Sequence, residues 1–304
     1  MDFAFSIDLM GILGIMFAMI ILGYIAKPKK ESLEDIAKLL INYGVPALIF
    51  SAFVLEFNAD MLLSMSTVLL FAVGTVLIGY GVSFLVIKIM KIDNKMRREF
   101  LFASVFGNTG FIGIPVCLAV FGREGALLAA VFDFGITFMI FTLGLFVLLG
   151  GKGDGILGSL KNLINPPIIA CIVGLIFALA NIPIPSLAMT GINMLTAMTP
   201  PLAMLFIGGM LSHVSKGEYQ IKPLTGLVLT KLILIPLVVA ACIKLFGVVG
   251  VMAGVILLQA ATPTMTLAPV LYQSYIGNAK FSTSAVFITV LLSIITIPLI
   301  MLLL

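Results

Sequence analysis

The chain has 304 residues, of which 62% are hydrophobic and 10% are charged, and its formal net charge is +4. Soluble domains are roughly 45–50% apolar and about 25% charged, so a soluble fold of this size cannot bury this much apolar surface. The composition argues against a secreted protein, a nucleic-acid-binding protein and a cytosolic enzyme. It predicts an all-α polytopic protein of the cell (inner or cytoplasmic) membrane, surrounded by lipid and without a nucleic-acid partner.

Cysteine and histidine usage narrows the chemistry further. Cys117, Cys171 and Cys242 lie inside apolar segments without metal-ligand spacing, which is typical of small core residues rather than of a disulfide framework. The chain has one His and no Trp, so we expect no metal site and no cofactor. Asp2 and Asp8 precede the first apolar run, where a secretory signal would carry Lys or Arg, and this run is therefore predicted to be a spanning helix.

Charged and turn residues divide the chain into apolar segments of spanning length. A hydrocarbon core of about 30 Å needs about 20 apolar residues per helix. The long uncharged stretch Asn162–Ser212 exceeds one span and is divided by the turn at Asn181–Pro185. The sequence predicts ten spans, numbered here in chain order: 6–26, 36–55, 61–88, 99–120, 125–149, 164–181, 187–212, 223–246, 249–274 and 281–304.

Basic residues predict the orientation of these spans. Fourteen of the 17 Lys and Arg residues fall at odd-numbered connections, whereas the second connection carries Glu56 and Asp60 and no basic residue. Because cytoplasmic loops are enriched in Lys and Arg, the odd connections are predicted to be cytoplasmic and both termini to face outside. The basic residues concerned are Lys27, Lys29, Lys30, Lys38, Lys88, Lys91, Lys95, Arg97, Arg98, Lys152, Lys161, Lys216, Lys222 and Lys280.

Ten spans divide into two sets of five, spans 1–5 within residues 1–150 and spans 6–10 within residues 160–304. An odd number in each half forces the halves into opposite orientations, so the sequence predicts a 5+5 inverted repeat. Two short similarities lie at matching places in the halves. Residues 44–50 resemble residues 200–206, and residues 130–132 resemble residues 285–287.

Spans 4 and 9 carry Gly or Pro together with small polar residues near the expected bilayer midplane, in residues 107–115 and 259–269. Helices tend to break at proline, and broken backbone in the bilayer is tolerated only where protein or a polar cavity satisfies it. A matched pair of interrupted helices is typical of a transporter binding site. The alternative interpretation is a pair of proline kinks that only shape helix packing.

Each break would leave free N–H groups at a new helix N-terminus, which attract an anion, and free carbonyls at a new C-terminus, which can hold a cation. Small polar side chains can add hydrogen bonds, so an anion can bind without a buried Arg. The substrate-binding residues predicted from the two spans are Asn108, Thr109, Gly110, Pro115, Gln259, Thr262, Pro263 and Thr264.

The segment Asn108–Pro115 resembles the span-4 motif of the auxin efflux carrier family, which includes the plant auxin carriers and bacterial malate and malonate permeases. The resemblance implies that spans 4 and 9 cross at their breaks, with Pro263 as the span-9 counterpart of Asn108 and Pro115. It also implies a scaffold domain from spans 1, 2, 6 and 7, a core or transport domain from spans 3–5 and 8–10, and a homodimer through the scaffold.

The chain differs from the plant carriers in two places. It has only a short link between its halves, and it has Thr262-Pro263-Thr264 where plant carriers have an Asn-rich motif. The substrate is therefore predicted only as a small organic anion: dicarboxylates such as malate or malonate, monocarboxylates and aromatic, auxin-like carboxylates all stay open.

Two charges lie well inside predicted spans. Asp133 in span 5 can take a proton or help to bind Na⁺, with Asn108 and Thr262 as further candidates for ion coupling; alternatively, Asp133 lies near the outer interface and pairs with Arg123. Lys231 in span 8 is predicted to extend toward the cytoplasm. Further polar residues and prolines either face the crossing of spans 4 and 9 or pack between helices: Asn42, Tyr43, Pro46, Thr199, Pro200 and Tyr272.

These features favour a secondary active transporter that works by alternating access, with Na⁺ or H⁺ as the coupling ion. No phosphate-binding loop is present to support ATP-driven transport. An intramembrane aspartyl protease needs two carboxylates and a zinc enzyme needs ligands that the chain lacks, so no enzyme is predicted. A passive channel or facilitator for organic anions stays open as the alternative.

Overall fold

The structure is a computed structural model that describes residues 3–57, 61–148, 166–213, 221–266, 268–269, 272 and 280–304. Parts of several sequence predictions fall outside these residues. They are Asp2, Asp60, the link 150–161 with Lys152 and Lys161, the first residues of span 6, Lys216, the C-terminal end of span 9, and the side chains of Asp8 and Lys280.

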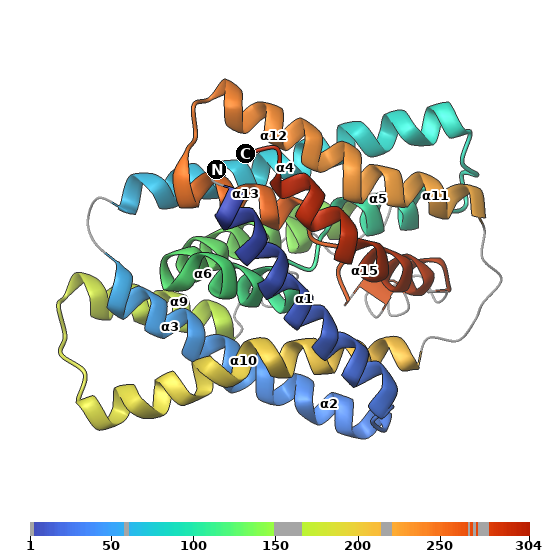
Figure 1. Cartoon of the computed structure of the whole chain (residues 1–304). Coiled ribbons are helices and arrows are strands. Elements are labelled where there is room, and N and C mark those ends of the chain that lie inside the picture. The colour runs from blue at the N-terminus through green and yellow to red at the C-terminus, as the bar shows by residue number, and fades with distance from the viewer. Residues whose placement is uncertain are drawn as a thin grey trace. The chain divides into compact units, whose positions relative to one another are not determined.

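Every regular element in the described ranges is a helix, which agrees with the predicted all-α membrane protein (Figure 1). Six helical stretches are long and apolar enough to cross a membrane: Lys30–Glu56, Met61–Met90, Thr109–Leu148, Ser186–Ser212, Ile221–Leu245 and Phe281–Met301. The α-helices are α1 (Phe3–Ala26), α2 (Lys30–Leu39), α3 (Val45–Glu56), α4 (Met61–Met90), α5 (Arg97–Val105), α6 (Ile114–Met139), α7 (Leu145–Leu148), α9 (Pro166–Leu179), α10 (Ser186–Ser212), α11 (Ile221–Leu229), α12 (Ile235–Leu245), α13 (Gly250–Ala260) and α15 (Lys280–Met301).

The stretch Thr109–Leu148 spans 40 residues but is not one helix. Gly122 interrupts it with φ 68° and ψ −160°, a backbone conformation that side-chain-bearing residues rarely adopt. A Cβ built at Gly122 would meet nothing within 4 Å, so the backbone angle rather than crowding explains the glycine. The chain therefore bends sharply between the predicted spans 4 and 5.

In the part of the chain that the structure describes, four short π-helical turns widen the helices: η1 (Leu40–Gly44), η2 (Thr109–Gly113), η3 (Ile140–Gly144) and η5 (Thr230–Leu234). Three of them end two residues before a proline, namely Pro46, Pro115 and Pro236. Proline cannot donate to the carbonyl four residues back, and its ring crowds that turn, so one extra residue relieves the conflict. In η5 the Ile235 N–H bonds the Thr230 carbonyl, five residues earlier. Such π-turns occur frequently at functional sites.

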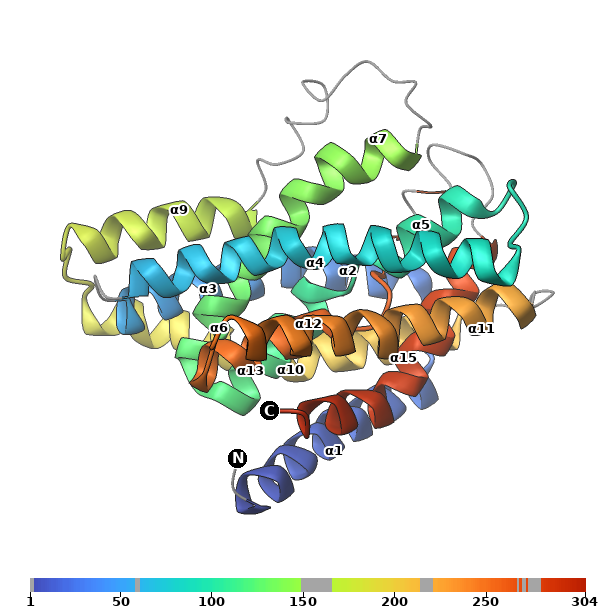
Figure 2. The ribbon, with the colours of Figure 1, turned by 90° about the horizontal axis from the view of Figure 1, so that it is seen from above.

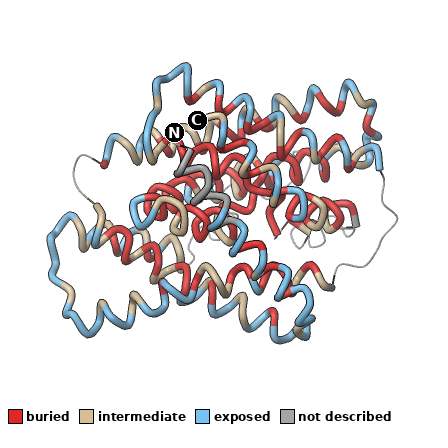
Figure 3. Tube along the Cα trace, in the orientation of Figure 1, coloured by how far each residue is buried: buried red, intermediate tan, exposed pale blue. Residues whose placement is uncertain are grey.

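The chain forms two compact units, which are described separately. Unit 1 combines Met1–Val68, Gly110–Phe134 and Ile164–His213. Within it α1 packs along α10, and α3 packs on α9 and α10 (Figures 1 and 2). Small residues allow α1 and α10 to approach each other closely, since a Cβ at Gly208 of α10 would lie only 2.8 Å from the Tyr24 backbone nitrogen of α1. Large apolar residues of α1 and α9, such as Ile21 and Ile176, are exposed, as lipid-facing residues are. Figure 3 colours the exposed positions along the chain pale blue.

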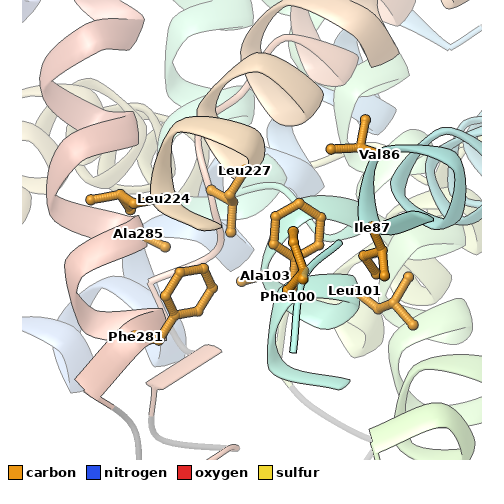
Figure 4. Packing of buried hydrophobic residues seen from close by; sticks show 10 residues of the cluster. Val86, Ile87, Phe100, Leu101, Ala103, Leu224, Leu227, Phe281 and Ala285 are labelled. Atoms are coloured by element: carbon orange, nitrogen blue, oxygen red, sulfur yellow. The ribbon is translucent and has the colours of Figure 1, made fainter. Parts of the chain in front are cut away.

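Unit 2 combines Leu69–Thr109, Gly135–Leu163 and Val214–Leu304. Within it α11, η5 and α12 form one continuous helix (Figure 2), and α13 is buried from Ala253 to Ala260 (Figure 3). Apolar side chains of α4, α5, α11 and α15 form a cluster in which Phe100 stacks on Phe281 with ring centroids 6.4 Å apart (Figure 4). The buried Glu99 carboxylate accepts a 2.8 Å hydrogen bond from the Ser282 backbone, which ties α5 to the first turn of α15.

Candidate functional site

The predicted span 4 is interrupted earlier than its proline suggests. Helix α5 ends at Val105, Phe106 is extended with φ −89° and ψ 117°, and helical structure resumes at Thr109. Pro115 lies inside the following helix, where η2 accommodates it. The expectation that proline marks the break in span 4 is therefore wrong: the break lies at residues 106–108.

The predicted span 9 is interrupted at its threonines and proline, as the sequence indicates. Helix α13 ends at Ala260, and residues 262–265 leave the helical conformation. Thr262, Pro263 and Thr264 are buried in unit 2. In span 4, Asn108 at the end of the break and Thr109, where helical structure resumes, also belong to unit 2 and are also buried.

The two interruptions pair with each other, and residues 106–108 and 262–265 are called the paired breaks below. Gly107 and Thr264 form an antiparallel bridge. The Asn108 N–H donates to the Pro263 carbonyl at 2.8 Å, and the Met265 N–H donates to the Phe106 carbonyl at 3.0 Å. Each non-helical segment thus satisfies the backbone of the other, which is the condition for irregular backbone inside a membrane protein.

The pairing requires a glycine at position 107. A Cβ added there would lie 2.9 Å from the Lys231 ammonium nitrogen and would collide with the Thr262 hydroxyl oxygen. Neither neighbour has free space around it, because both side chains are fully buried. Gly107 therefore lets two pieces of backbone approach as closely as the antiparallel bridge demands.

Threonine hydroxyls cap the helices that end at the paired breaks. The Thr264 hydroxyl donates to the Ala103 carbonyl of α5 at 2.9 Å, and the Thr262 hydroxyl donates to the Gln259 carbonyl of α13 at 2.7 Å. These carbonyls belong to the last turns of their helices, which lack helical donors. The Asn108 amide lies 3.5 Å from the Thr266 hydroxyl, so polar side chains from both breaks form one buried cluster.

Lys231 is a member of this cluster that the sequence did not assign to it. Its side chain is 1% exposed, and its ammonium group donates to the Ala260 carbonyl at 3.3 Å. The expectation that Lys231 extends to the cytoplasm is therefore wrong, because the carbonyl end of α13 supplies a buried partner. The available signal was a charge well inside span 8 that lies five residues before Pro236, within the turn that this proline widens.

Asp133 and Gly110 lie together in unit 1. A Cβ built on Gly110 would be 3.4 Å from one Asp133 carboxylate oxygen, so the carboxylate lies over the backbone where helical structure resumes after residue 108. Arg123 donates to the Asn193 side chain at 3.4 Å. Both interpretations of Asp133, as an ion-coupling group and as the partner of Arg123, stay predictions.

The remaining candidates lie in unit 1, except Gln259 on α13 and Tyr272, which belong to unit 2. Asn42 and Tyr43 are exposed in η1, whereas Thr199 is fully buried and its hydroxyl would meet a Cβ on Gly44 at 2.8 Å. The Thr199 hydroxyl also donates to the Leu195 carbonyl of its own helix, so it packs α10 against η1. Pro46 is half-buried in α3, and Gln259 and Tyr272 are buried. Gln259 lies in the last turn of α13, and its carbonyl accepts from the Thr262 hydroxyl of the cluster.

Two comparisons with known proteins bear on this geometry. A family model described as a membrane transport protein matches residues 9–157 and 155–301. The chain belongs to this membrane transport protein family. The match covers nearly the whole chain and confirms the resemblance to the auxin efflux carriers. A transport family together with helices of spanning length identifies an integral membrane transport protein.

Archaeal members of the family extend over almost the same length. An uncharacterized transporter of Methanothermobacter thermautotrophicus is 28% identical over 290 residues, which are 92% of this chain and 93% of the relative. An uncharacterized transporter of Methanocaldococcus jannaschii is 26% identical over 302 residues, which are 95% of this chain and 97% of the relative. The aligned regions therefore cover nearly the whole of both relatives.

Proposed function

We propose that this membrane transport protein is a secondary active transporter of a small organic anion, a carboxylate, that works by alternating access. The observation that carries the proposal is the buried polar cluster at the paired breaks. Asn108, Thr262 and Thr264 lie buried in unit 2, and Gly107 lies against a buried ammonium group. Polar and charged groups inside a membrane protein mark substrate pathways, and a positive charge favours an anion.

The architecture that we propose for this mechanism is ten spans in a 5+5 inverted repeat, with spans 4 and 9 crossing at their breaks and both termini outside. The bend at Gly122 supports the separation of spans 4 and 5. The two segments matched by the family model divide at residues 155–157, between the proposed halves.

The proposed scaffold domain consists of spans 1, 2, 6 and 7, and the proposed core domain of the other spans. Unit 1 contains the helices of spans 1, 2, 6 and 7, which supports this scaffold. Residues 110–134, from proposed spans 4 and 5, also cluster in unit 1. A homodimer through the scaffold and residence in the cytoplasmic membrane complete the proposal.

We assign the carboxylate of the substrate to the side chains of Asn108, Thr109 and Thr262, with Pro263 and Thr264 shaping the same site in unit 2. The Asn108 amide and the Thr109 hydroxyl can donate to a carboxylate, and the Thr262 hydroxyl can do so when it turns away from the Gln259 carbonyl. Such bonds to an ionised group are stronger than those between neutral groups. Asp133 is the proposed ion-coupling residue of unit 1, because a carboxylate over the backbone at Gly110 can exchange a cation or proton.

Uptake into liposomes tests the function. The reconstituted protein is offered labelled dicarboxylates, monocarboxylates and aromatic carboxylates under a Na⁺ gradient, a pH gradient or neither. We expect saturable uptake of one class, and a loss of at least about tenfold in Asn108→Ala, because the amide is a buried binding group. Asn94→Ala is the matched control, since Asn94 lies exposed in a turn after α4.

Each outcome assigns a different function. Gradient-driven uptake that is lost in Asn108→Ala supports the carrier. Uptake that exceeds transporter turnover and ignores every gradient supports a passive channel or facilitator instead. Failure of all carboxylates to move, or equal uptake by Asn108→Ala and the control, contradicts an organic-anion site at the paired breaks.

A further inference from the structure

The break in span 9 creates a position that favours a cation. Helix α13 ends at Ala260. The Ala261 N–H still donates to the Leu257 carbonyl and the Thr262 N–H to the Gln259 carbonyl, but no continuing helix supplies a donor to the Ala260 carbonyl. These carbonyls also form the negative end of the helix dipole, where a cation is stabilised. In an apolar interior, such a group of carbonyls is a position where Na⁺ can be coordinated.

The chain fills this position with its own donors. The Lys231 ammonium group donates to the Ala260 carbonyl at 3.3 Å, and the Thr262 hydroxyl donates to the preceding carbonyl, that of Gln259, at 2.7 Å. The ammonium nitrogen also lies 2.9 Å from the Cβ position of Gly107 in the facing break. The positive charge therefore sits between the end of α13 and the break in span 4, both in unit 2.

No carboxylate among the described residues forms an ion pair with Lys231. A buried charge that keeps no partner of opposite sign is strongly unfavourable, so an arrangement of this kind is stabilised when an anion arrives. The carbonyl end of α13 offsets part of this penalty, and a bound substrate carboxylate would offset more.

We infer that Lys231 is a tethered internal cation, which occupies the position of a coupling Na⁺ at the end of α13 and makes anion transport independent of Na⁺. The effect of Lys231 on transport rests on the proposed function, the transport of an organic anion. The claim that Lys231 occupies the cation position at the end of α13 does not depend on that proposal. Lys231 is thereby a positioning residue, and any gradient that drives this protein would be one of H⁺, acting at another group.

Lys231 would make the same contact with the Ala260 carbonyl if its only role were to hold η5 against α13. The variants must therefore separate the effect of the charge from the effect of packing. Lys231→Met keeps the length of the stem and removes the charge. Lys231→Ala removes both and leaves room for a small cation. Lys244→Ala is the matched control, because Lys244 lies exposed in the last turn of the same long helix.

Uptake by these variants is measured in Na⁺ and in choline, without a Na⁺ gradient. We expect wild type to transport equally in both, Lys231→Met to lose at least about tenfold in both, and Lys231→Ala to lose uptake in choline but regain part of it in Na⁺ or methylammonium. The inference is overturned if uptake by the wild-type protein collapses when choline replaces Na⁺. It is also overturned if Lys231→Met takes up the carboxylate as fast as the wild-type protein does.

Thermal unfolding in detergent tests the occupied cation position without any substrate. Na⁺ should leave the midpoint of wild type and Lys244→Ala unchanged relative to choline, and should raise that of Lys231→Ala, because a ligand that binds only the folded state stabilises it. A Na⁺-dependent rise in wild type contradicts the inference. If no carboxylate is transported while this pattern holds, the proposed function fails and the tethered cation stands.

Discussion

Helices α10 and α13 both meet proline in apolar surroundings, yet only α13 is interrupted there. Helix α10 continues from Ser186 to Ser212 through Pro200 and Pro201. Helix α13 ends at Ala260, and Pro263 lies in non-helical backbone. Helix α10 thus continues through a pair of prolines, whereas α13 ends shortly before a single proline.

The difference lies in what surrounds each proline. In unit 1, the Thr196 and Thr199 hydroxyls donate to the Ile192 and Leu195 carbonyls of α10 itself, so these side chains find acceptors within their own helix. In unit 2, the Pro263 carbonyl accepts the Asn108 N–H, and the Thr264 hydroxyl reaches the Ala103 carbonyl of another helix. A helix is interrupted where a second broken segment replaces the lost hydrogen bonds, and proline alone is insufficient.

The strongest test of this comparison is to obstruct the pairing at its closest point. Gly107→Ala introduces a methyl group against the buried Thr262 and Lys231 side chains, and we expect it to lower the free energy of unfolding by about 2–3 kcal/mol and to abolish uptake. Thermal unfolding and uptake measure the effect. Gly74→Ala, where a Cβ meets nothing within 4 Å, should leave both unchanged or slightly improve stability. Equal behaviour of the two variants would show that the close approach is unimportant.

A smaller effect is expected when one interhelical hydrogen bond is removed. Thr264→Val keeps the shape of the side chain but leaves the Ala103 carbonyl without its donor, which should reduce the free energy of unfolding by about 1–3 kcal/mol. Thr190→Val is the control, because the Thr190 hydroxyl bonds its own helix at an exposed place. Denaturation of purified protein by heat compares the two, and a control as damaging as Thr264→Val would contradict the assignment.

The smallest effect is expected from the prolines themselves. Pro263→Ala leaves the carbonyl that accepts from Asn108 in place, so stability should fall by less than about 1 kcal/mol and uptake should persist. Pro200→Ala gives α10 an additional N–H donor and should not lower stability. Thermal unfolding and uptake of both variants are compared with wild type. Loss of uptake in Pro263→Ala would mean that proline, and not the pairing, maintains the break.

The sequence predicts which segments are unusual but not how they are held. Polar residues such as Asn108 and Thr262 stand out because they interrupt long apolar runs, and this pattern needs no tertiary information. The position of the break in span 4 does need it. The Asn108 N–H is satisfied by a carbonyl 155 positions later, at Pro263, whereas Pro115 is accommodated locally by η2.

The burial of Lys231 was unpredictable for the same reason. A lysine inside a span normally extends toward the nearest interface. Here its acceptor is the Ala260 carbonyl, which is free only because α13 ends at that residue. The sequence contains both the lysine and the interrupted span, but only the fold brings the ammonium group to the end of the helix.

Equilibrium binding of a labelled carboxylate to the purified protein tests most directly whether the paired breaks form the substrate site. The account predicts saturable binding by wild type and Asn94→Ala, and affinity at least about tenfold weaker in Asn108→Ala, whose amide is removed from the buried cluster. Saturable binding of equal strength in all three proteins would contradict it, because the substrate would then bind away from the paired breaks.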